Sequence, residues 1–309
     1  MSEPNNETAN VTTEASADPT ATPSANKAGR KPKALASVCV FGVLVVGAVV
    51  FWPTLRPQLF VVAVGPTVAP DEQVSIADIS HTPWDELLRK HVTDEGLVDY
   101  DSWKASTADV QKLDDYLTQL SHADRSRTAT KEQELAFWIN AYNALTVKGI
   151  LREYPTTSIR NHTGAIGYNI WDHYSLRVGN QPYSLSAIEH EILRKMDEPR
   201  IHFAIVCASI GCPRLLNRAF EAGRLYEQLD GNAKNFFAQQ RNFQIDEGTK
   251  TVRVSSILEW FATDFGADSV AQLKRIRPYL PNDEAMQFVD GDVTIAYLEY
   301  DWNINRQQP

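Results

Sequence analysis

An uncharged apolar run near the N-terminus constrains this chain more than any other feature. Residues 35–52 read LASVCVFGVLVVGAVVFW, with no charged side chain among them. A run of about 18 residues at roughly 1.5 Å each is about 27 Å long, close to the thickness of the hydrocarbon core of a bilayer. Trp52 and Pro53 stand where an interfacial aromatic residue and a helix stop are typical. The sequence therefore predicts a transmembrane helix over residues 34–52, with the membrane as a partner.

The charges that flank this run predict its orientation. Four basic residues lie within residues 27–33, whereas Arg56 alone follows closely on the other side. Basic flanks stay in the cytoplasm, so we expect a cytoplasmic N-terminus and an extracytoplasmic main domain. The protein is then a single-pass protein of the plasma (inner) membrane, held by a signal anchor. Cleavage near Ala63 or Ala69, as in a long signal peptide, is an alternative that leaves the compartment unchanged.

The apolar run divides the rest of the chain into three further parts. Residues 1–33 are polar and end in the basic cluster, so we expect a disordered cytoplasmic tail. Residues 53–75 are punctuated by proline, which predicts a linker or a membrane-proximal strand. Residues 76–309 are long enough for one extracytoplasmic domain with a substantial core.

The net charge excludes one class of partner. The chain has 30 basic and 39 acidic residues, a formal charge of −9. Acids and bases balance within residues 1–33, so the acidic excess belongs to the rest of the chain. Because nucleic acids are bound by clustered Lys and Arg, we expect no nucleic-acid partner. A membrane-attached enzyme or binding domain remains.

The periodicity of apolar residues predicts mostly helices with a few short strands. The strongest signal is residues 131–153, whose middle is apolar on every face, as in a central buried helix. Other helices are expected over residues 82–91, 108–120, 186–196, 224–240 and 256–265. Strands are expected over residues 174–178, 181–184, 200–206, 243–245, 251–254 and 293–300. We therefore predict an α+β fold: a single helix-rich domain with short, mostly antiparallel strands.

Five motifs in a fixed order resemble a known family. They are FWINAYNAL at 137–145, SLSAIEHEILR at 184–194, RIHFAIVCASIGCPRL at 200–215, SILEWFATDF at 256–265 and YLEYDWNIN at 297–305. On these motifs, residues from about 84 to 305 resemble the family catalogued as domain of unknown function 547. The resemblance implies no established activity, substrate or catalytic residue. The chemistry therefore has to be inferred from the residues themselves.

Two cysteines stand directly after the expected strand over residues 200–206. Cys207 and Cys212 are five residues apart in the segment CASIGCP. In an oxidising compartment such a pair is expected to form a structural disulfide. A free pair would instead supply a catalytic or redox-active thiol, because a strand end presents a reactive group from a rigid base. The chain has no HExxH or nucleotide-binding motif, and we expect neither a metal nor a cofactor.

A cysteine nucleophile needs a base and a group that orients the base. His190 is the candidate base, because it lies away from the apolar face of its expected helix. His202 precedes Cys207 on the expected strand by five residues, which puts their side chains on opposite faces and roughly 16 Å apart. Asp301 or Glu189 would orient the base. Their alternative roles are a turn residue that bonds its own backbone and a capping-box acid.

Two amides lie on one face of the expected central helix. Asn140 and Asn143 are three residues apart, so their side chains are neighbours on that face. Buried carboxamides need hydrogen-bond partners. The pair therefore either holds loop backbone in place or donates to a bound substrate or oxyanion.

These residues fit more than one class of function. The first is a thiol-dependent hydrolase or acyl transferase, with Cys207 as nucleophile and His190 as base. Asp301 would then orient the base, and Asn140 or Asn143 would bind the oxyanion. The second is a non-catalytic binding domain for a peptide, glycan or small molecule, stapled by the disulfide. A thiol–disulfide redox protein is the third, so the sequence leaves open whether the domain is an enzyme.

Overall fold

The computed structural model describes residues 61–164 and 168–308, all within one compact unit. The tail predicted over residues 1–33 and the transmembrane helix predicted over residues 34–52 lie outside the described residues. Within the described ranges, no helix has the length and apolar character needed to cross a membrane. The structure therefore bears on the main domain and on part of the segment before it.

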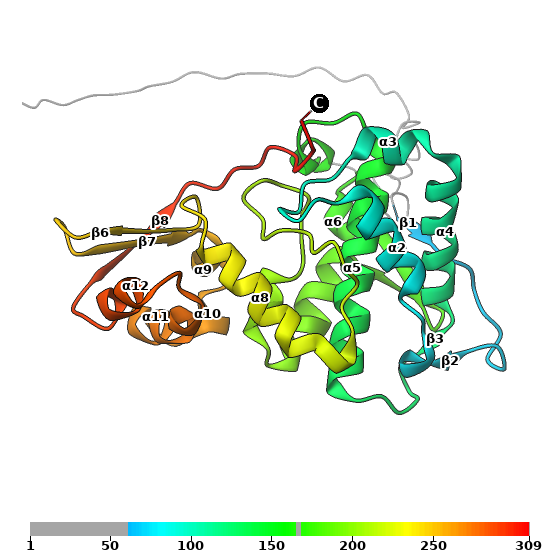
Figure 1. Ribbon diagram of the computed structural model, residues 1–309. Coiled ribbons are helices and arrows are strands. Elements are labelled where there is room, and N and C mark those ends of the chain that lie inside the picture. The colour runs from blue at the N-terminus through cyan, green and yellow to red at the C-terminus, as the bar shows by residue number, and fades with distance from the viewer. Residues whose placement is uncertain (1–60, 165–167, 309) are drawn as a thin grey trace, which may run out of the picture. The chain divides into compact units, whose positions relative to one another are not determined.

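Helix α5 (Lys131–Glu153) forms the centre of the domain, as its apolar pattern predicts. The Thr130 hydroxyl accepts a hydrogen bond from the backbone of Gln133, whose side chain accepts one from the Thr130 backbone. Residues on every face of its middle are buried. Against α5 pack α3 (Tyr100–Ala105) and α4 (Thr107–Ser121), and α2 (Thr82–His91) packs against α4 (Figure 1).

The remaining helices are shorter and mostly follow α5 in the chain. They are α6 (Ile170–His173), α7 (Leu185–Ala187), α8 (Leu225–Phe237), α9 (Ile257–Trp260), α10 (Ala262–Phe265), α11 (Ser269–Ile276) and α12 (Asp283–Val289). The helix predicted over residues 186–196 is composite. After α7 it continues as a π-helix at Ile188–Ile192 and a 3-10 helix at Leu193–Met196. Its cap is Ser184, not Ser186, so Glu189 is not a capping-box acid.

The strands form three small sheets. The strands are β1 (Val62–Val64), β2 (Val74–Ser75), β3 (Ala123–Asp124), β4 (Tyr174–Val178), β5 (Gln181–Ser184), β6 (Phe243–Asp246), β7 (Thr251–Ser255) and β8 (Thr294–Leu298). The strand orders in the three sheets are β1–β4–β5, β2–β3 and β6–β7–β8. The hairpins β4–β5 and β6–β7 are antiparallel, as predicted. The pairings β1–β4, β2–β3 and β7–β8 are parallel. The α+β class is therefore confirmed for the described residues, but the prediction of mostly antiparallel strands is wrong.

Two segments differ from their predicted structure. In the segment predicted as a linker or a membrane-proximal strand, residues 62–64 and 74–75 form two short strands, β1 and β2, which pair with strands of the domain. Residues 200–206, predicted as a strand, instead begin in the 3-10 helix η5 (Pro199–Phe203). Pro199 favours a helical start, and the Glu198 side chain accepts a hydrogen bond from the Arg200 backbone there. The alternating faces expected for this segment therefore do not exist.

The buried side chains form two core clusters. The first surrounds α5 and includes Cys212. The second lies between α8, the β6–β7–β8 sheet and α10–α12, and includes Phe203 from η5. After β8 the chain runs back toward the first cluster, where the Asn305 carbonyl accepts a hydrogen bond from the Val98 backbone (Figure 1). The loop with both cysteines and this C-terminal segment thus connect the two clusters.

Candidate functional site

Residues 204–212, the thiol loop, follow η5 and are held from two sides. The carboxamide of Asn143 on α5 donates to the Ala204 carbonyl and accepts from the Val206 N–H, at 2.9 and 3.0 Å. On the other side, the backbone N–H groups of Ile210 and Gly211 donate to carbonyls of residues 303 and 301. A Cβ atom at Gly211 would lie 2.9 Å from the Tyr300 ring, so only glycine allows this approach.

The two sulfurs of the thiol loop are 2.7 Å apart. A disulfide has an S–S bond of about 2.03–2.05 Å, and both cysteines in this structure are free thiols. The structure therefore does not support the structural disulfide predicted between Cys207 and Cys212. Each sulfur would need to move by only a few tenths of an ångström for a bond to form.

The two sulfurs share most of their polar contacts. The Ser209 and Tyr300 hydroxyls lie 3.1 and 3.2 Å from the Cys207 sulfur, and the backbone N–H of Cys207 is the donor that contacts Cys212 alone. The Cys212 sulfur accepts from the Cys207 backbone N–H at 2.9 Å, the Tyr300 hydroxyl at 3.1 Å and the Ser209 hydroxyl at 3.4 Å. Burial alone raises a thiol pKa, but donors aimed at the sulfur favour the thiolate. The neighbouring Cys207 thiol, followed by the Ser209 and Tyr300 hydroxyls and the Cys207 N–H, outweighs burial and lowers the pKa of Cys212 to about 6. The neighbouring Cys212 and burial both raise the pKa of Cys207.

Both cysteines line a cavity of about 150 Å³ whose wall is mainly aromatic and aliphatic. The lining residues are Tyr142, Trp171, Glu189, His202, Ile205, Cys207, Cys212, Pro213, Ile257, Trp260, Phe261, Tyr300 and Trp302. Trp260 is 47% exposed and its ring stacks on that of Trp302, with the centroids 5.7 Å apart. Large aromatic rings therefore extend from the cavity to the protein surface.

One wall of this cavity carries a buried acid. Glu189, in the π-helix, is 9% exposed and accepts a hydrogen bond from the Tyr142 hydroxyl at 3.2 Å. Burial raises the pKa of Glu189 to about 7, against the smaller opposite effect of the Tyr142 hydrogen bond. A carboxyl group with this pKa exchanges protons near neutral pH.

Another wall carries a buried histidine with an acid partner. The His202 Nε2 is 2.8 Å from Asp264 Oδ2, and the ring stacks on Phe261 with centroids 4.1 Å apart. Burial lowers the pKa of His202 to about 4, so the imidazole is neutral at pH 7. Arg194 binds both oxygens of Asp264, at 2.6 and 2.7 Å. Hydrogen bonds from Arg194 and His202 outweigh partial burial and lower the pKa of Asp264 to about 2.

A comparison with family models assigns much of this site to one region of the chain. Residues 126–237 match the model of the family DUF547, which is described as a family of proteins of unknown function. The match confirms the resemblance over this range, while the motifs at residues 256–265 and 297–305 lie beyond it. Comparisons with curated proteins and with solved structures returned no match. The DUF547 match thus contains the thiol loop, Glu189 and His202, whereas Asp264 and Tyr300 lie outside it.

The structure brings some of the predicted site residues together and separates others. His202 lines the same cavity as Cys207, because η5 replaces the expected strand. His190 is exposed on the π-helix within the DUF547 match and bonds Arg194 at 3.2 Å. Asp301 accepts hydrogen bonds from the Asn303 backbone and side chain, as expected of a turn residue. Neither His190 nor Asp301 lines the thiol cavity.

The two buried amides of the DUF547 region hold loop backbone. Asn143 fixes residues 204–206 as described above. Asn140 donates to the Phe220 carbonyl at 2.8 Å and accepts from the Phe220 N–H at 2.9 Å. Both carboxamides therefore bond main chain with their oxygen and their nitrogen. This arrangement matches the loop-holding alternative for the pair, and makes Asn143 a positioning residue for Cys207.

Several residues of the site were not singled out from the sequence. Ser209 lies between the cysteines, and its position in the CASIGC segment is a local signal that a loop donor is available. Tyr142 lies among the apolar residues of α5, where its hydroxyl gives no distinguishing pattern. Tyr300 is 88 residues from Cys212, beyond the DUF547 match, so only tertiary structure could identify it. Asp264 has the same difficulty, because its partner His202 is 62 residues away.

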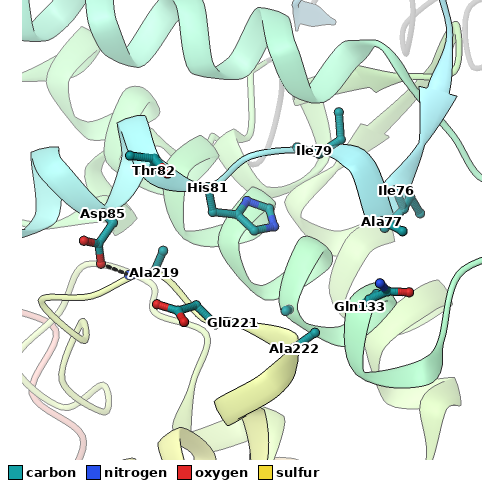
Figure 2. Close-up of a pocket in the computed structure, with 11 residues that line it drawn as sticks. Ile76, Ala77, Ile79, His81, Thr82, Asp85, Gln133, Ala219, Glu221 and Ala222 are labelled. Atoms are coloured by element: carbon teal, nitrogen blue, oxygen red, sulfur yellow. Dashed lines mark hydrogen bonds between the residues drawn. The ribbon is translucent and has the colours of Figure 1, made fainter.

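A second, larger cavity of about 290 Å³ lies elsewhere in the domain, between the segment before α2 and the start of α5. Figure 2 shows the His81 ring projecting toward the space bounded by Gln133, Glu221 and Ala222. The His81 Nδ1 is 2.8 Å from the Tyr116 hydroxyl, and burial lowers the pKa of His81 to about 4. No group of three or more potential metal ligands occurs among residues 61–164 and 168–308.

Proposed function

We propose that this domain is a thiol–disulfide exchange protein whose reactive pair is Cys212 and Cys207. The observation that carries the proposal is the geometry of the thiol loop. The two sulfurs are 2.7 Å apart, the Ser209 and Tyr300 hydroxyls contact both of them, and the backbone N–H of Cys207 donates to Cys212. A thiolate beside a second thiol is the arrangement that such exchange requires, because the first attacks a disulfide and the second resolves the product.

The proposed reaction balances without a further reactant. The Cys212 thiolate attacks one sulfur of a substrate disulfide, forms a mixed disulfide and releases one substrate thiolate. The Cys207 thiol then loses its proton and attacks the Cys212 sulfur, which releases the second substrate thiolate. The protein gains a Cys207–Cys212 disulfide, and the substrate disulfide is reduced to two thiols. The reverse sequence oxidises a substrate dithiol.

The cavity supports an apolar substrate group. Its volume of about 150 Å³ suits a single side chain or a small aromatic molecule, and its wall is mainly aromatic and aliphatic. Trp260 and Trp302 at the rim offer stacking surfaces to the chain or ring that carries the disulfide. We therefore propose a peptide or small-molecule disulfide with an apolar neighbour group as the substrate class.

The compartment proposed for this chemistry is extracytoplasmic. The basic cluster before residues 34–52 supports an N-terminus in the cytoplasm and a membrane-anchored domain on the other side. Disulfide exchange with structural disulfides belongs to such oxidising compartments. A reporter enzyme fused after residue 309 tests this directly: a reporter active only outside the cytoplasm supports the topology, and one active only inside contradicts it.

An exchange assay with purified reduced protein tests the function. The probe is an aromatic disulfide that releases a coloured thiolate at each step. In a Cys39→Ser background, which leaves only this pair of cysteines, we expect two equivalents of coloured thiolate per protein and a Cys207–Cys212 disulfide by mass spectrometry. The variant Cys207→Ser should release one equivalent and keep the probe bound at Cys212. If the wild-type protein releases no coloured thiolate, the proposed function is wrong.

A thiol-dependent hydrolase or acyl transferase is the second candidate. The observation that favours it is the pair of His202 and Asp264, because His202 lines the cavity with both cysteines. However, among the described residues no hydrogen bond joins either sulfur to an imidazole; Ser209 and Tyr300 supply the polar contacts instead. An activated thioester distinguishes the two functions: catalytic turnover that His202→Ala abolishes would favour acyl transfer.

A further inference from the structure

We propose that Glu189 is the acid–base residue of the exchange reaction: it takes the proton of Cys207 and returns it to the departing substrate thiolate. This inference rests on the proposed exchange function. Neither the fold nor the contacts of the two sulfurs otherwise explain why this carboxyl group is buried. This role of Glu189 also supplies a base for Cys207, because burial still raises the pKa of that thiol after Cys212 has lost its charge in the mixed disulfide.

The position of Glu189 is the first support. Its side chain lines the same cavity as both sulfurs, on the only wall segment of the described cavity that carries a carboxylate. It projects from the π-helix Ile188–Ile192, a local geometry that is frequent at functional sites. The Tyr142 hydroxyl bonds one carboxyl oxygen and orients the group. No ion pair of the described residues neutralises it.

The size of the cavity is the second support. The space is only about 150 Å³, and the Glu189 carboxyl group and the Cys207 sulfur both face it. A carboxyl group can act as a general base directly or through one intervening water. We therefore assign the proton transfer to the part of this space that the substrate group leaves open.

The charges around Glu189 make it responsive to the state of the thiol pair. Burial raises its pKa most, and the charge of Cys212 raises it further. When Cys212 becomes part of a mixed disulfide, that negative charge is gone, and Glu189 ionises more readily. The acid is thus ready to accept a proton at the step in which Cys207 must lose one.

Other titratable groups near Glu189 act in both directions. Arg194 lowers its pKa and Asp264 raises it, while the Tyr142 hydrogen bond lowers it. The other titratable groups that face the cavity are His202, Cys207 and Tyr300. His202 is neutral at pH 7 because burial lowers its pKa to about 4, and burial raises the pKa of Tyr300 well above its usual value. Glu189 is therefore the cavity group other than Cys212 that titrates near neutral pH.

The proton steps balance as follows. The Cys207 thiol passes its proton to the Glu189 carboxylate, which becomes a neutral acid. The Cys207 thiolate attacks the Cys212 sulfur, and the substrate thiolate leaves with the electron pair of the broken S–S bond. Glu189 then donates the proton to that thiolate. The carboxylate is restored, and no proton is consumed or left over.

Stopped-flow measurement of both steps with the aromatic disulfide probe tests this role in the full-length protein. The first equivalent of coloured thiolate reports attack by Cys212, and the second reports resolution by Cys207. In Glu189→Gln we expect the second phase to slow by about 10²-fold or more, as for loss of a general base. The first phase should stay within about twofold, because the glutamine amide keeps a similar size and can still accept from Tyr142. The exposed neighbour Glu191 supplies the matched control: Glu191→Gln should change neither phase.

A second variant tests the proposal if Glu189→Gln does not fold. Tyr142→Phe removes the hydrogen bond that lowers the pKa of Glu189, so the pH midpoint of the second phase should move upward. A purely structural role of the pair would change the melting temperature without moving that midpoint. A normal second phase in folded Glu189→Gln, or an unmoved midpoint in Tyr142→Phe, overturns the proposal. The exchange function itself fails only if the wild-type protein releases no coloured thiolate, so the two failures are distinguishable.

Discussion

Two of the cavities in the described part of the domain differ in size and, more importantly, in how their polar groups are used. The larger, about 290 Å³, contains His81 and Asp85. His81 is held by the Tyr116 hydroxyl, and Asp85 accepts hydrogen bonds from Arg89 and the Ala219 backbone. The smaller, about 150 Å³, contains two thiols and a buried acid. Cavity volume would therefore have selected the less reactive of the two sites.

What separates the cavities is the proton affinity of their groups. In the larger cavity, burial holds His81 neutral at pH 7. In the smaller, Cys212 and Glu189 have pKa values of about 6 and about 7. Groups with pKa values near neutrality can donate and accept protons at working pH, whereas groups far from it stay in one state. Substitutions in and beside the two cavities test this contrast.

The largest effect is expected from replacing Cys212. The variant Cys212→Ser should lose all exchange with the aromatic disulfide probe, because its hydroxyl cannot act as a thiolate. The measurement is release of coloured thiolate over time. Cys39→Ser is the control and should retain both equivalents. Exchange that persists in Cys212→Ser would assign the attacking role to Cys207, the residue predicted from the sequence as the nucleophile of a hydrolase or acyl transferase.

A smaller effect is expected from removing one donor to Cys212. In Tyr300→Phe the thiolate loses a hydroxyl donor, so the pKa of Cys212 should rise by roughly one unit. Alkylation with iodoacetamide, measured across pH in a Cys207→Ser background, should then reach half its maximal rate at a higher pH. Tyr297→Phe, which changes an exposed tyrosine on β8 three residues before Tyr300, should leave the midpoint where it was. Equal midpoints in both variants would contradict the assigned donor.

The next effect concerns stability. Asp264→Ala removes the partner of both Arg194 and buried His202, and should lower the free energy of unfolding by about 2–3 kcal/mol. The folded-state pKa of Asp264 is depressed to about 2 from 3.8, so its contribution is fully present above about pH 4. It is lost as the pH falls toward 2, because protonation then favours the unfolded chain. Denaturant titrations at several pH values should show the gap between wild type and variant closing in that range.

The smallest effect is expected in the larger cavity. Tyr116→Phe leaves the His81 Nδ1 without its hydroxyl partner, which should cost about 1–2 kcal/mol of stability. The exchange rate of the thiol pair should not change. Chemical denaturation measures the first quantity, and the aromatic disulfide probe measures the second. A slowed exchange reaction would show that the two cavities are energetically coupled.

Most of the secondary structure could be predicted, because its signals are local. Helix α5 has the predicted bounds, as do the two strands of the β4–β5 hairpin. The parallel pairings could not be predicted, because β1 and β4 are about 110 residues apart and no turn joins them. The segment over residues 200–206 was misjudged because a short apolar run fits a buried 3-10 helix as well as a strand.

The residues of the candidate site could be predicted only where their signal is local. The sequence indicated the cysteine pair, since CASIGCP is a compact local signal. It could not indicate Tyr300 or Asp264, whose partners lie 88 and 62 residues away. The sequence made His190 the candidate base, because a histidine on a polar helix face has the same pattern whether it faces a cavity or solvent. The sequence therefore showed which reactive side chains the protein has, but it did not show which of them lie close together.

The 88 residues between Cys212 and Tyr300 also set an order of events during synthesis. At about 5–20 residues per second, translation of that interval takes roughly 4 to 18 s. Until Tyr300 has emerged and docked, the Cys212 sulfur lacks one of its donors. The thiol pair therefore acquires its full set of contacts only after nearly the whole chain has been made.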